Sequence, residues 1–437
     1  MKKLSTAFFA VALAALTAAP IHAADLLQVY QDALANDAEL RAAEANYRAT
    51  LEAQPLARSA LLPQLFADGE LGAFYSDPDR FPSVDGSRYD LSLNLSQSLY
   101  DQRNRIAVTQ ADLLVASAAA DLEAARQELI RRVSEDYFEV LLAGETLIFR
   151  RAEREAIGRQ MEQTQRRFEV GLIAITDVKE AQARLDIAKA DEILAENDLN
   201  LANERLAVIT NNYYEHLAAL KPDVLLPSEP DPADPEQWVA VALENNQELV
   251  ARRLSAEIAR EQIARQRAEG RPTLGLGASV SDTGYSGVGD NRFLDSSDAQ
   301  VGLRLNIPVY TGGRVSALTR EAREQFEASQ EAVVLTERRV IQLTRSSYLS
   351  VISNAARARA LRQAVESNQA ALESTEAGFE VGTRTQVDVL LALQDLFRAQ
   401  RDQAAARYAF VVDRLLLQRA VGTLSEEDLR LLNKFLE

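Results

Sequence analysis

One short stretch of the sequence occurs twice, as Phe168-Glu169-Val170-Gly171 and as Phe379-Glu380-Val381-Gly382. Each copy is followed at the same distance by an Asp-Val pair, at 177–178 and at 388–389. The two halves also correspond further towards the N-terminus, since Pro63 matches Pro272 and Tyr100 matches Tyr310 with the offset changing by at most two residues. The sequence therefore predicts a duplicated unit, 24–212 and 237–422, with the same order of elements in both copies.

The segment between the two copies, 213–236, is rich in proline. Proline lacks the backbone N–H that a helix interior needs, so this segment is predicted to be a connector without a continuous helix. A tail, 423–437, follows the second copy.

Each copy contains a very long stretch without helix breakers, 104–170 and 315–381, in which no proline occurs. At ~1.5 Å per residue, about 65 residues make a helix close to 100 Å long. The segments that follow, 176–211 and 386–421, carry small and apolar residues at heptad spacing, which is typical of coiled-coil packing. In the first copy these positions are Val178, Ala181, Leu185, Ala188, Ala195, Leu199, Ala202, Leu206 and Ile209. We expect each long helix to turn back and pack against its return helix.

Alternation of apolar and polar residues with a period of two predicts four strands, at 64–75, 89–99, 273–281 and 299–309. A helix precedes each strand pair, at 37–62 and 246–270. Strands of about ten residues with one apolar side suit a membrane barrel as well as a half-buried soluble sheet. Four strands do not close a barrel, because about eight are needed even for a filled core. A barrel would therefore draw its strands from several chains, and three chains would supply twelve.

The N-terminal residues 1–23 have the form of a cleaved secretory signal peptide, with Lys2 and Lys3 before an apolar run and small residues at the end. Export through the inner membrane is therefore expected. The chain has no cysteine and only two histidines, which disfavours zinc sites and Cys/His nucleophiles. A net charge of -17 argues against nucleic acid as a partner. We find no motif for a catalytic site, a cofactor or a metal.

These features resemble the TolC family of outer-membrane channels across the whole mature chain. The resemblance rests on the duplicated layout, on 170–178 and 381–389, and on the segments 308–313 and 420–424. It implies a mixed α/β membrane protein, mostly α. Three chains would form a twelve-stranded transmembrane β-barrel in the outer membrane of a Gram-negative bacterium, continuous with a periplasmic α-helical coiled-coil barrel.

The resemblance also implies a passive exit duct for multidrug efflux and type I secretion. Its expected partners are outer-membrane lipid, a periplasmic adaptor protein and an inner-membrane transporter of the resistance-nodulation-division (RND) or ABC type.

The same resemblance assigns roles to the two turns between long and return helices. Asp388 corresponds to an acidic ring at the pore entrance, with possible cation binding. Thr176, Asp177 and Arg384 correspond to a network that holds the gate shut. The turns themselves would contact the adaptor, through Val170, Gly171, Leu172, Val381, Gly382 and Thr383. A second aspartate ring of the family falls on Leu391 here, so cation block at the entrance is expected to be weaker.

Simpler interpretations of these residues stay open at this point. Asp177 with Glu180, and Thr385 with Asp388, have the spacing of N-terminal helix caps. Arg384 has the alternative of being a solvated turn residue. A soluble periplasmic coiled-coil adaptor or fibre would explain the long helices and the signal peptide, but not four amphipathic strands that recur with them.

Overall fold

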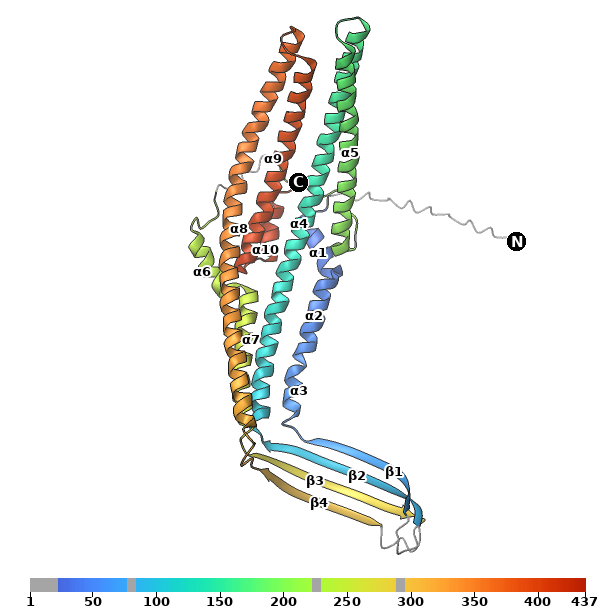
Figure 1. Cartoon of the computed structure of the whole chain (residues 1–437), viewed down its shortest axis with the longest axis vertical. Helices are drawn as coiled ribbons and strands as arrows, with labels where there is room; N and C mark the ends of the chain where they lie inside the picture. The colour runs from blue at the N-terminus through green and yellow to red at the C-terminus, as the bar shows by residue number, and fades with distance from the viewer. Residues whose placement is uncertain (1–22, 77–83, 222–228, 288–294) are drawn as a thin grey trace, which may run out of the picture.

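The computed structural model describes residues 23–76, 84–221, 229–287 and 295–437. The helices form a long rod, and one sheet lies across one end of it (Figure 1). The predicted signal peptide lies outside the described residues apart from Ala23. Among the described residues, none of the helices has a stretch apolar and long enough to cross a bilayer.

The sheet contains four antiparallel strands in the order β1-β2-β3-β4. Their bounds are Gln64–Ser76, Val84–Tyr100, Thr273–Ser286 and Ser296–Asn306. Both central strands are longer than the predicted 89–99 and 273–281, because pairing between β2 and β3 continues past the apolar alternation to Ser87 and Ser286. The predicted end of the last strand at 309 is wrong. β4 stops at Asn306, two residues before Pro308, which has no N–H to donate.

The strand register sorts the side chains onto two chemically different faces. One row pairs Leu65 with Leu95, Ala278 and Val301, and its neighbours on the same face are also largely apolar. The next row, on the opposite face, joins Gln64, Ser96, Gly277 and Gly302. Because the side-chain period of a strand is two, one face is apolar and the other polar.

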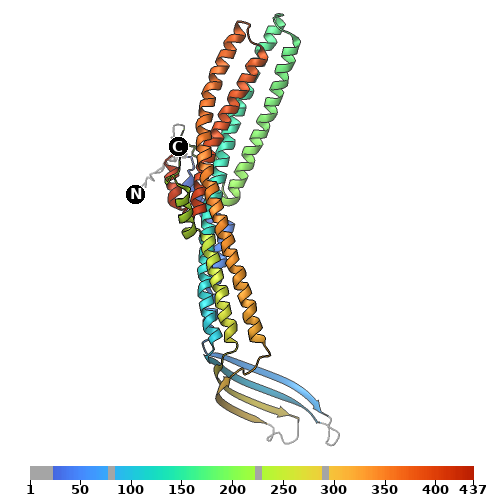
Figure 2. The same cartoon turned by 60° about the vertical axis from the view of Figure 1, so that its left-hand side comes forward.

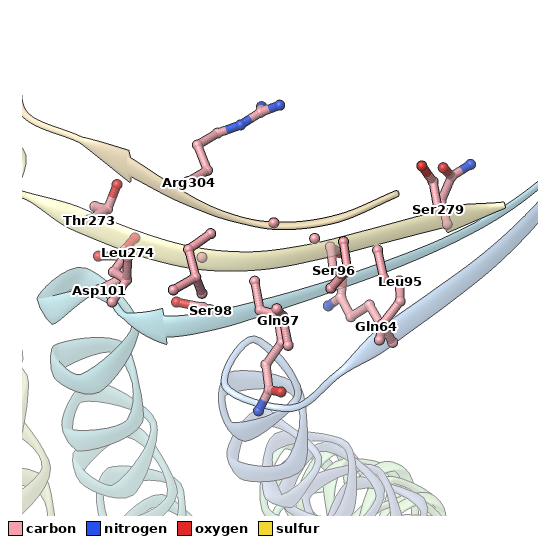
Figure 3. Close-up of a pocket in the computed structure, with 18 of the residues that line it drawn as sticks. Gln64, Leu95, Ser96, Gln97, Ser98, Asp101, Thr273, Leu274, Ser279 and Arg304 are labelled. Atoms are coloured by element: carbon pink, nitrogen blue, oxygen red, sulfur yellow. The ribbon is translucent and has the colours of Figure 1, made fainter. Parts of the chain in front are cut away.

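The polar face is hollowed near the helices by a depression of about 810 Å³. Arg304, Thr273 and Ser279 project on this side of the sheet in Figure 3, whereas Gln97 projects on the other.

Two long helices run from the sheet to the far end of the rod. α4 covers Gln102–Glu169 and α8 covers Arg314–Glu380, 68 and 67 residues respectively. Each turns back into a helix of 36 residues, α5 (Ile175–Thr210) and α9 (Gln386–Val421). α5 buries eight of the nine predicted heptad positions, and Leu199 is partly buried. The chain therefore forms two helical hairpins that lie side by side (Figure 2).

The helical segment before each strand pair starts earlier than predicted. The predicted helix 246–270 is present as one helix, the predicted helix 37–62 is interrupted at Glu52, and a further short helix precedes each of them. The first segment comprises α1 (Leu26–Asn36), α2 (Ala38–Leu51) and α3 (Ala53–Ser59). The second segment comprises α6 (Pro235–Asn245) and α7 (Gln247–Ala268). The short helices end at Asp37 and Asn246, where the predicted helices begin, and both residues adopt extended backbone and cap the following helix. α6 starts inside the predicted connector because proline is well tolerated in the first turn of a helix.

Asp37 also ties its break to the long helix α4. It is 3% exposed, and two hydrogen bonds of 3.0 Å join its carboxylate to the Arg132 guanidinium. Burial tends to raise the pKa of the Asp37 carboxyl, but Arg132 and the Leu40 N–H more than offset this, so the pKa lies below its ordinary value.

The main core lies at the waist of the rod, where the shorter helices surround α4 and α9. Tyr137 meets Phe138 edge to face there, Phe138 packs against Tyr408, and the Tyr137 hydroxyl donates to the carbonyls of Ala24 and Ala218. Ala24 also pairs with the connector at Leu217. The tail 423–437 contains a short helix, α10 (Glu426–Asn433), which packs into this core through Leu429 and Leu432. The waist therefore fixes where the two hairpins emerge.

Candidate functional site at the hairpin tips

The two hairpins turn at the end of the rod opposite the sheet, and their tips are neighbours there (Figures 1 and 2). The first tip joins α4 to α5 and the second joins α8 to α9. Both contain a glycine with positive φ, Gly171 at 76° and Gly382 at 80°. Glycine adopts this left-handed conformation without a steric penalty, so it ends each long helix abruptly. The duplicated Val-Gly pair is therefore the local cause of both turns.

The first tip is closed by backbone hydrogen bonds. The Gly171 N–H donates to the Phe168 carbonyl over 2.9 Å, and the Leu172 N–H donates to the Arg167 carbonyl over 2.9 Å. Two apolar side chains then point into solvent, because Val170 is 70% exposed and Leu172 is 73% exposed.

The second tip has the same turn and an additional side-chain cap. Thr383 donates to the Gly378 carbonyl from its backbone N–H and from its hydroxyl, over 2.8 and 3.0 Å. Thr385 and Asp388 then form a reciprocal capping box at the start of α9. The Asp388 N–H donates to Thr385 Oγ1 over 3.2 Å, and the Thr385 N–H donates to Asp388 Oδ2 over 2.8 Å. The predicted cap at Thr385 and Asp388 is thus confirmed.

This capping box also determines the charge of Asp388. Hydrogen bonds from the Thr385 backbone and hydroxyl, together with the nearby Arg384 guanidinium, hold the pKa of the Asp388 carboxyl below its ordinary value. Asp388 therefore carries a full negative charge at neutral pH at the outermost part of the helical rod. Leu391, one turn further along α9, is 43% exposed and places an apolar side chain there.

Asp177 does not cap its helix. The residue before α5 is Ala174, which provides no side-chain hydrogen bond, and Asp177 lies at the third position of the helix. The prediction that Asp177 is an N-cap is therefore wrong, because the turn after Gly171 brings Ala174 to the capping position. A carboxylate in the first helical turn still interacts favourably with the helix dipole.

The predicted network residues lie at the two tips without bonding one another within one chain. Thr176 and Asp177 are in the first turn of α5, and Arg384 is in the turn before α9. Among the described residues, these three side chains share no hydrogen bond or ion pair. The Arg384 side chain folds back beside Gly378, where an added Cβ would lie 2.8 Å from Arg384 Cγ.

The contacts that do join the two hairpins near their tips are ones that the sequence reasoning missed. The Arg167 guanidinium lies over the ring of Phe379, 4.3 Å from its centroid. Further from the tip, Arg184 of α5 donates to the Gln394 amide oxygen of α9 over 2.9 Å. A small apolar cluster buries the same boundary, formed by Ile157, Ala181, Leu185, Ala188 and Leu390. The repeated phenylalanine before each Val-Gly pair is the one sequence signal that could have drawn attention to Phe379.

Comparison with known proteins identifies the family. The sequence model of the family described as "Outer membrane efflux protein" matches residues 29–212 and 238–423, one stretch for each hairpin with its strands. The chain belongs to the outer membrane efflux protein family. It is therefore an outer-membrane channel protein with a helical part that reaches into the periplasm.

Two curated relatives match the chain over nearly its full length. The chain is 38% identical to the outer membrane protein TolC of Escherichia coli, over 100% of this chain and 90% of that protein. It is 31% identical to the alkaline protease secretion protein AprF of Pseudomonas aeruginosa, over 93% of this chain and 86% of that protein. The chain thus matches a family named for efflux and a relative named for protease secretion.

Solved structures have the same fold at lower sequence identity. A structure of CusC, whose title describes transmembrane channel formation, has a TM-score of 0.79 at 18% identity, over 91% of this chain and 92% of that one. The outer membrane protein VceC of Vibrio cholerae has a TM-score of 0.76 at 22% identity, over 91% and 96% of the two chains. The fold is therefore that of the outer membrane efflux channels.

Proposed function

We propose that three copies of the chain form a passive exit duct through the outer membrane, used for drug efflux and for type I secretion. The observation that carries the proposal is the open sheet. Among the described residues, β1 and β4 each pair on one side only. Unpaired strand edges expose N–H and C=O groups that need partners, and joining β4 of one copy to β1 of the next satisfies them. Three copies then give a closed barrel of twelve strands.

The two faces of the sheet support an orientation in the membrane. On the apolar face, Leu65, Val301 and Leu305 are each more than 60% exposed in the single chain. Such a face is stable against lipid, whereas the polar face with its depression suits a water-filled lumen. The helices leave the sheet at one end only (Figure 1) and extend the duct into the periplasm.

The hairpin tips are proposed as the docking site for a periplasmic adaptor. Val170, Leu172 and Val381 present apolar side chains that are 70%, 73% and 76% exposed, next to the turn residues Gly171, Gly382 and Thr383. An adaptor that covers them would bury this apolar surface. It would also connect the duct to an inner-membrane RND or ABC transporter, which supplies the energy.

The tips are also proposed as the gate. Thr176 and Asp177 at one tip and Arg384 at the other form no side-chain hydrogen bond or ion pair among the described residues of their own chain. Opposite charges on neighbouring tips would pair between copies around the three-fold axis. Asp388 would then form a ring of carboxylates at the entrance. One exposed ion pair is worth only ~0–1 kcal/mol, so the closed state would depend on its repetition by symmetry.

The test is to purify the protein from outer membranes, measure its mass by native mass spectrometry and record conductance in planar bilayers. The proposal expects a trimer that inserts and conducts. A stable monomer in the soluble periplasmic fraction that never inserts would instead favour an adaptor or fibre protein.

A further inference from the structure

We propose that the chain binds the phosphate headgroup of an anionic phospholipid in a groove between β2, α4 and the start of β3. The groove has a volume of about 370 Å³ and is lined by Tyr100, Gln102, Arg105, Ile106, Thr109 and Arg271. The proposal rests on the membrane orientation given above. It names a ligand for a part of the molecule far from the hairpin tips.

Two guanidinium groups in this groove have no carboxylate partner among the described residues. Arg105 lies over the Tyr100 ring, 5.7 Å from its centroid, and Arg271 donates to the Gln102 side-chain oxygen. The acidic side chains at the same level are already paired, because Asp101 bonds to Arg103 and Glu269 bonds to Arg314. The groove is thus a local positive site on a chain whose net charge is -17.

The position of the groove suits a headgroup at the membrane surface. The strand register places Tyr100 opposite Leu274, which in turn pairs with Leu305 on the apolar face. This row is the last apolar one before the helices begin. Aromatic side chains at that level are typical of the membrane–water interface. A lipid whose acyl chains lie on the apolar face would bring its phosphate to Arg105 and Arg271.

The groove also stays accessible when the sheet closes into a barrel. It lies on the central strands β2 and β3, whereas the proposed contacts between copies use the outer edges of β1 and β4. Arginine suits the ligand, because its planar guanidinium can donate two parallel hydrogen bonds to a phosphate. Stacking on Tyr100 holds the Arg105 guanidinium in place without consuming its donors.

The experiment measures retained lipid by native mass spectrometry of trimers taken from nanodiscs with equal parts of phosphatidylglycerol and phosphatidylcholine. The wild type is expected to retain phosphatidylglycerol in preference, up to one molecule for each protomer. Arg105→Gln and Arg271→Gln are each expected to lower this preference about fivefold, and the double variant about 25-fold. Tyr100→Phe keeps the ring and is expected to resemble the wild type.

Arg304→Gln is the matched control, because it removes the same charge from the polar face at a similar level of the sheet (Figure 3). It is expected to change the preference less than twofold. Equal retention of both lipids by the wild type, or a double variant that equals the wild type, would overturn the proposal. So would displacement of the lipid by millimolar inorganic phosphate, which would identify a free anion as the ligand.

Conductance of the same preparation separates this proposal from the proposed function. A trimer that conducts but shows no lipid preference overturns only the headgroup site. A protein that neither trimerises nor inserts overturns both.

Discussion

The guanidinium of Arg167, in the last turn of α4, lies 4.3 Å from the ring centroid of Phe379, in the last turn of α8. This contact connects the two hairpins at their tips, where the gate is proposed. A cation–π contact at a partly exposed site is worth ~0.5–1 kcal/mol. Separation of the tips would break it in every protomer.

We therefore expect Arg167→Gln to favour separated tips. The loss of ~0.5–1 kcal/mol shifts the opening equilibrium of each protomer about two- to fivefold. The expected result is a higher mean single-channel conductance, or more frequent open events, in planar bilayers. Phe379→Leu should raise conductance or opening frequency in the same way. Phe379→Tyr retains the ring and should leave both unchanged. Arg166→Gln is the control, since Arg166 is exposed beside it. Equal effects of the changes at positions 166 and 167 would argue against this contact.

Neutral replacements of Asp177 or Arg384 test the proposed contacts between copies. Asp177→Asn and Arg384→Gln are each expected to raise single-channel conductance, because each removes one charge of the ion pair proposed to repeat around the three-fold axis. The double variant should add little to either single variant, since both act on one interaction. Unchanged conductance in all three variants would remove these side chains from the gate.

Asp388 should give the entrance a cation affinity that persists in mild acid. Its hydrogen bonds with Thr385 lower the pKa of the carboxyl, so the carboxylate stays charged until the pH falls below the ordinary range of aspartate. Block of the current by a divalent or trivalent cation is therefore expected to be the same at pH 7 and at pH 5. Asp388→Asn should abolish the block.

The matched variant is Leu391→Asp, which adds a second carboxylate one turn away and should strengthen the block. Block that weakens steeply between pH 7 and pH 5, or that survives Asp388→Asn, would assign the cation site to other groups.

Asp136 should make the waist more stable in mild acid. Burial, and to a lesser extent Glu139, raise the pKa of this carboxyl to about 6. The folded chain therefore binds a proton between about pH 4 and pH 6 that the unfolded chain has already released, and stability falls as the pH rises through that window. Asp136→Asn removes the ionised form, so it should raise the melting temperature at pH 7.5 and change it less at pH 5.

Asp198→Asn, at an exposed position of α5, is the control. Its melting temperature is expected to equal that of the wild type at both pH values. A lower melting temperature for Asp136→Asn at pH 7.5 would show that the ionised, half-buried carboxylate does not destabilise the folded chain.

Gly422 is expected to be the least replaceable glycine of the waist. It has φ of 83°, and an added Cβ would lie 2.4 Å from the Asn245 carbonyl oxygen. Gly422→Ala combines left-handed strain, ~1–2 kcal/mol, with a backbone clash where α9 meets the break between α6 and α7.

Gly312→Ala is the control, because its φ is 62° with nothing within 4 Å of the added atom. We expect a larger fall in melting temperature for Gly422→Ala, with faster hydrogen exchange in the last turn of α9. Equal falls in melting temperature for the two variants would mean that left-handed backbone strain alone, without the clash at Asn245, causes the destabilisation.

Local patterns in the sequence were enough to predict most of the elements. The long helices, the return helices and the four strands depend on proline placement, heptad spacing and period-two alternation, which act over a few residues. The sequence predicts the helices that begin after Asp37 and Asn246, whereas the short helices α1 and α6 that precede them escape prediction. Tertiary packing then fixes the position of Asp37, because the Arg132 guanidinium donates a hydrogen bond to its carboxylate across the waist.

Some features of the candidate site also follow from local sequence, whereas others depend on tertiary contacts. The sequence by itself determined the two turns at Gly171 and Gly382 and the cap between Thr385 and Asp388, since these depend on neighbouring residues along one chain segment. Only the tertiary structure decided that Arg167 reaches Phe379 and that Arg105 and Arg271 share a groove. The rotational phase of a straight helix drifts ~20° per heptad relative to a seven-residue repeat. Over helices of this length, the facing side chains at the far end depend on packing along the whole rod.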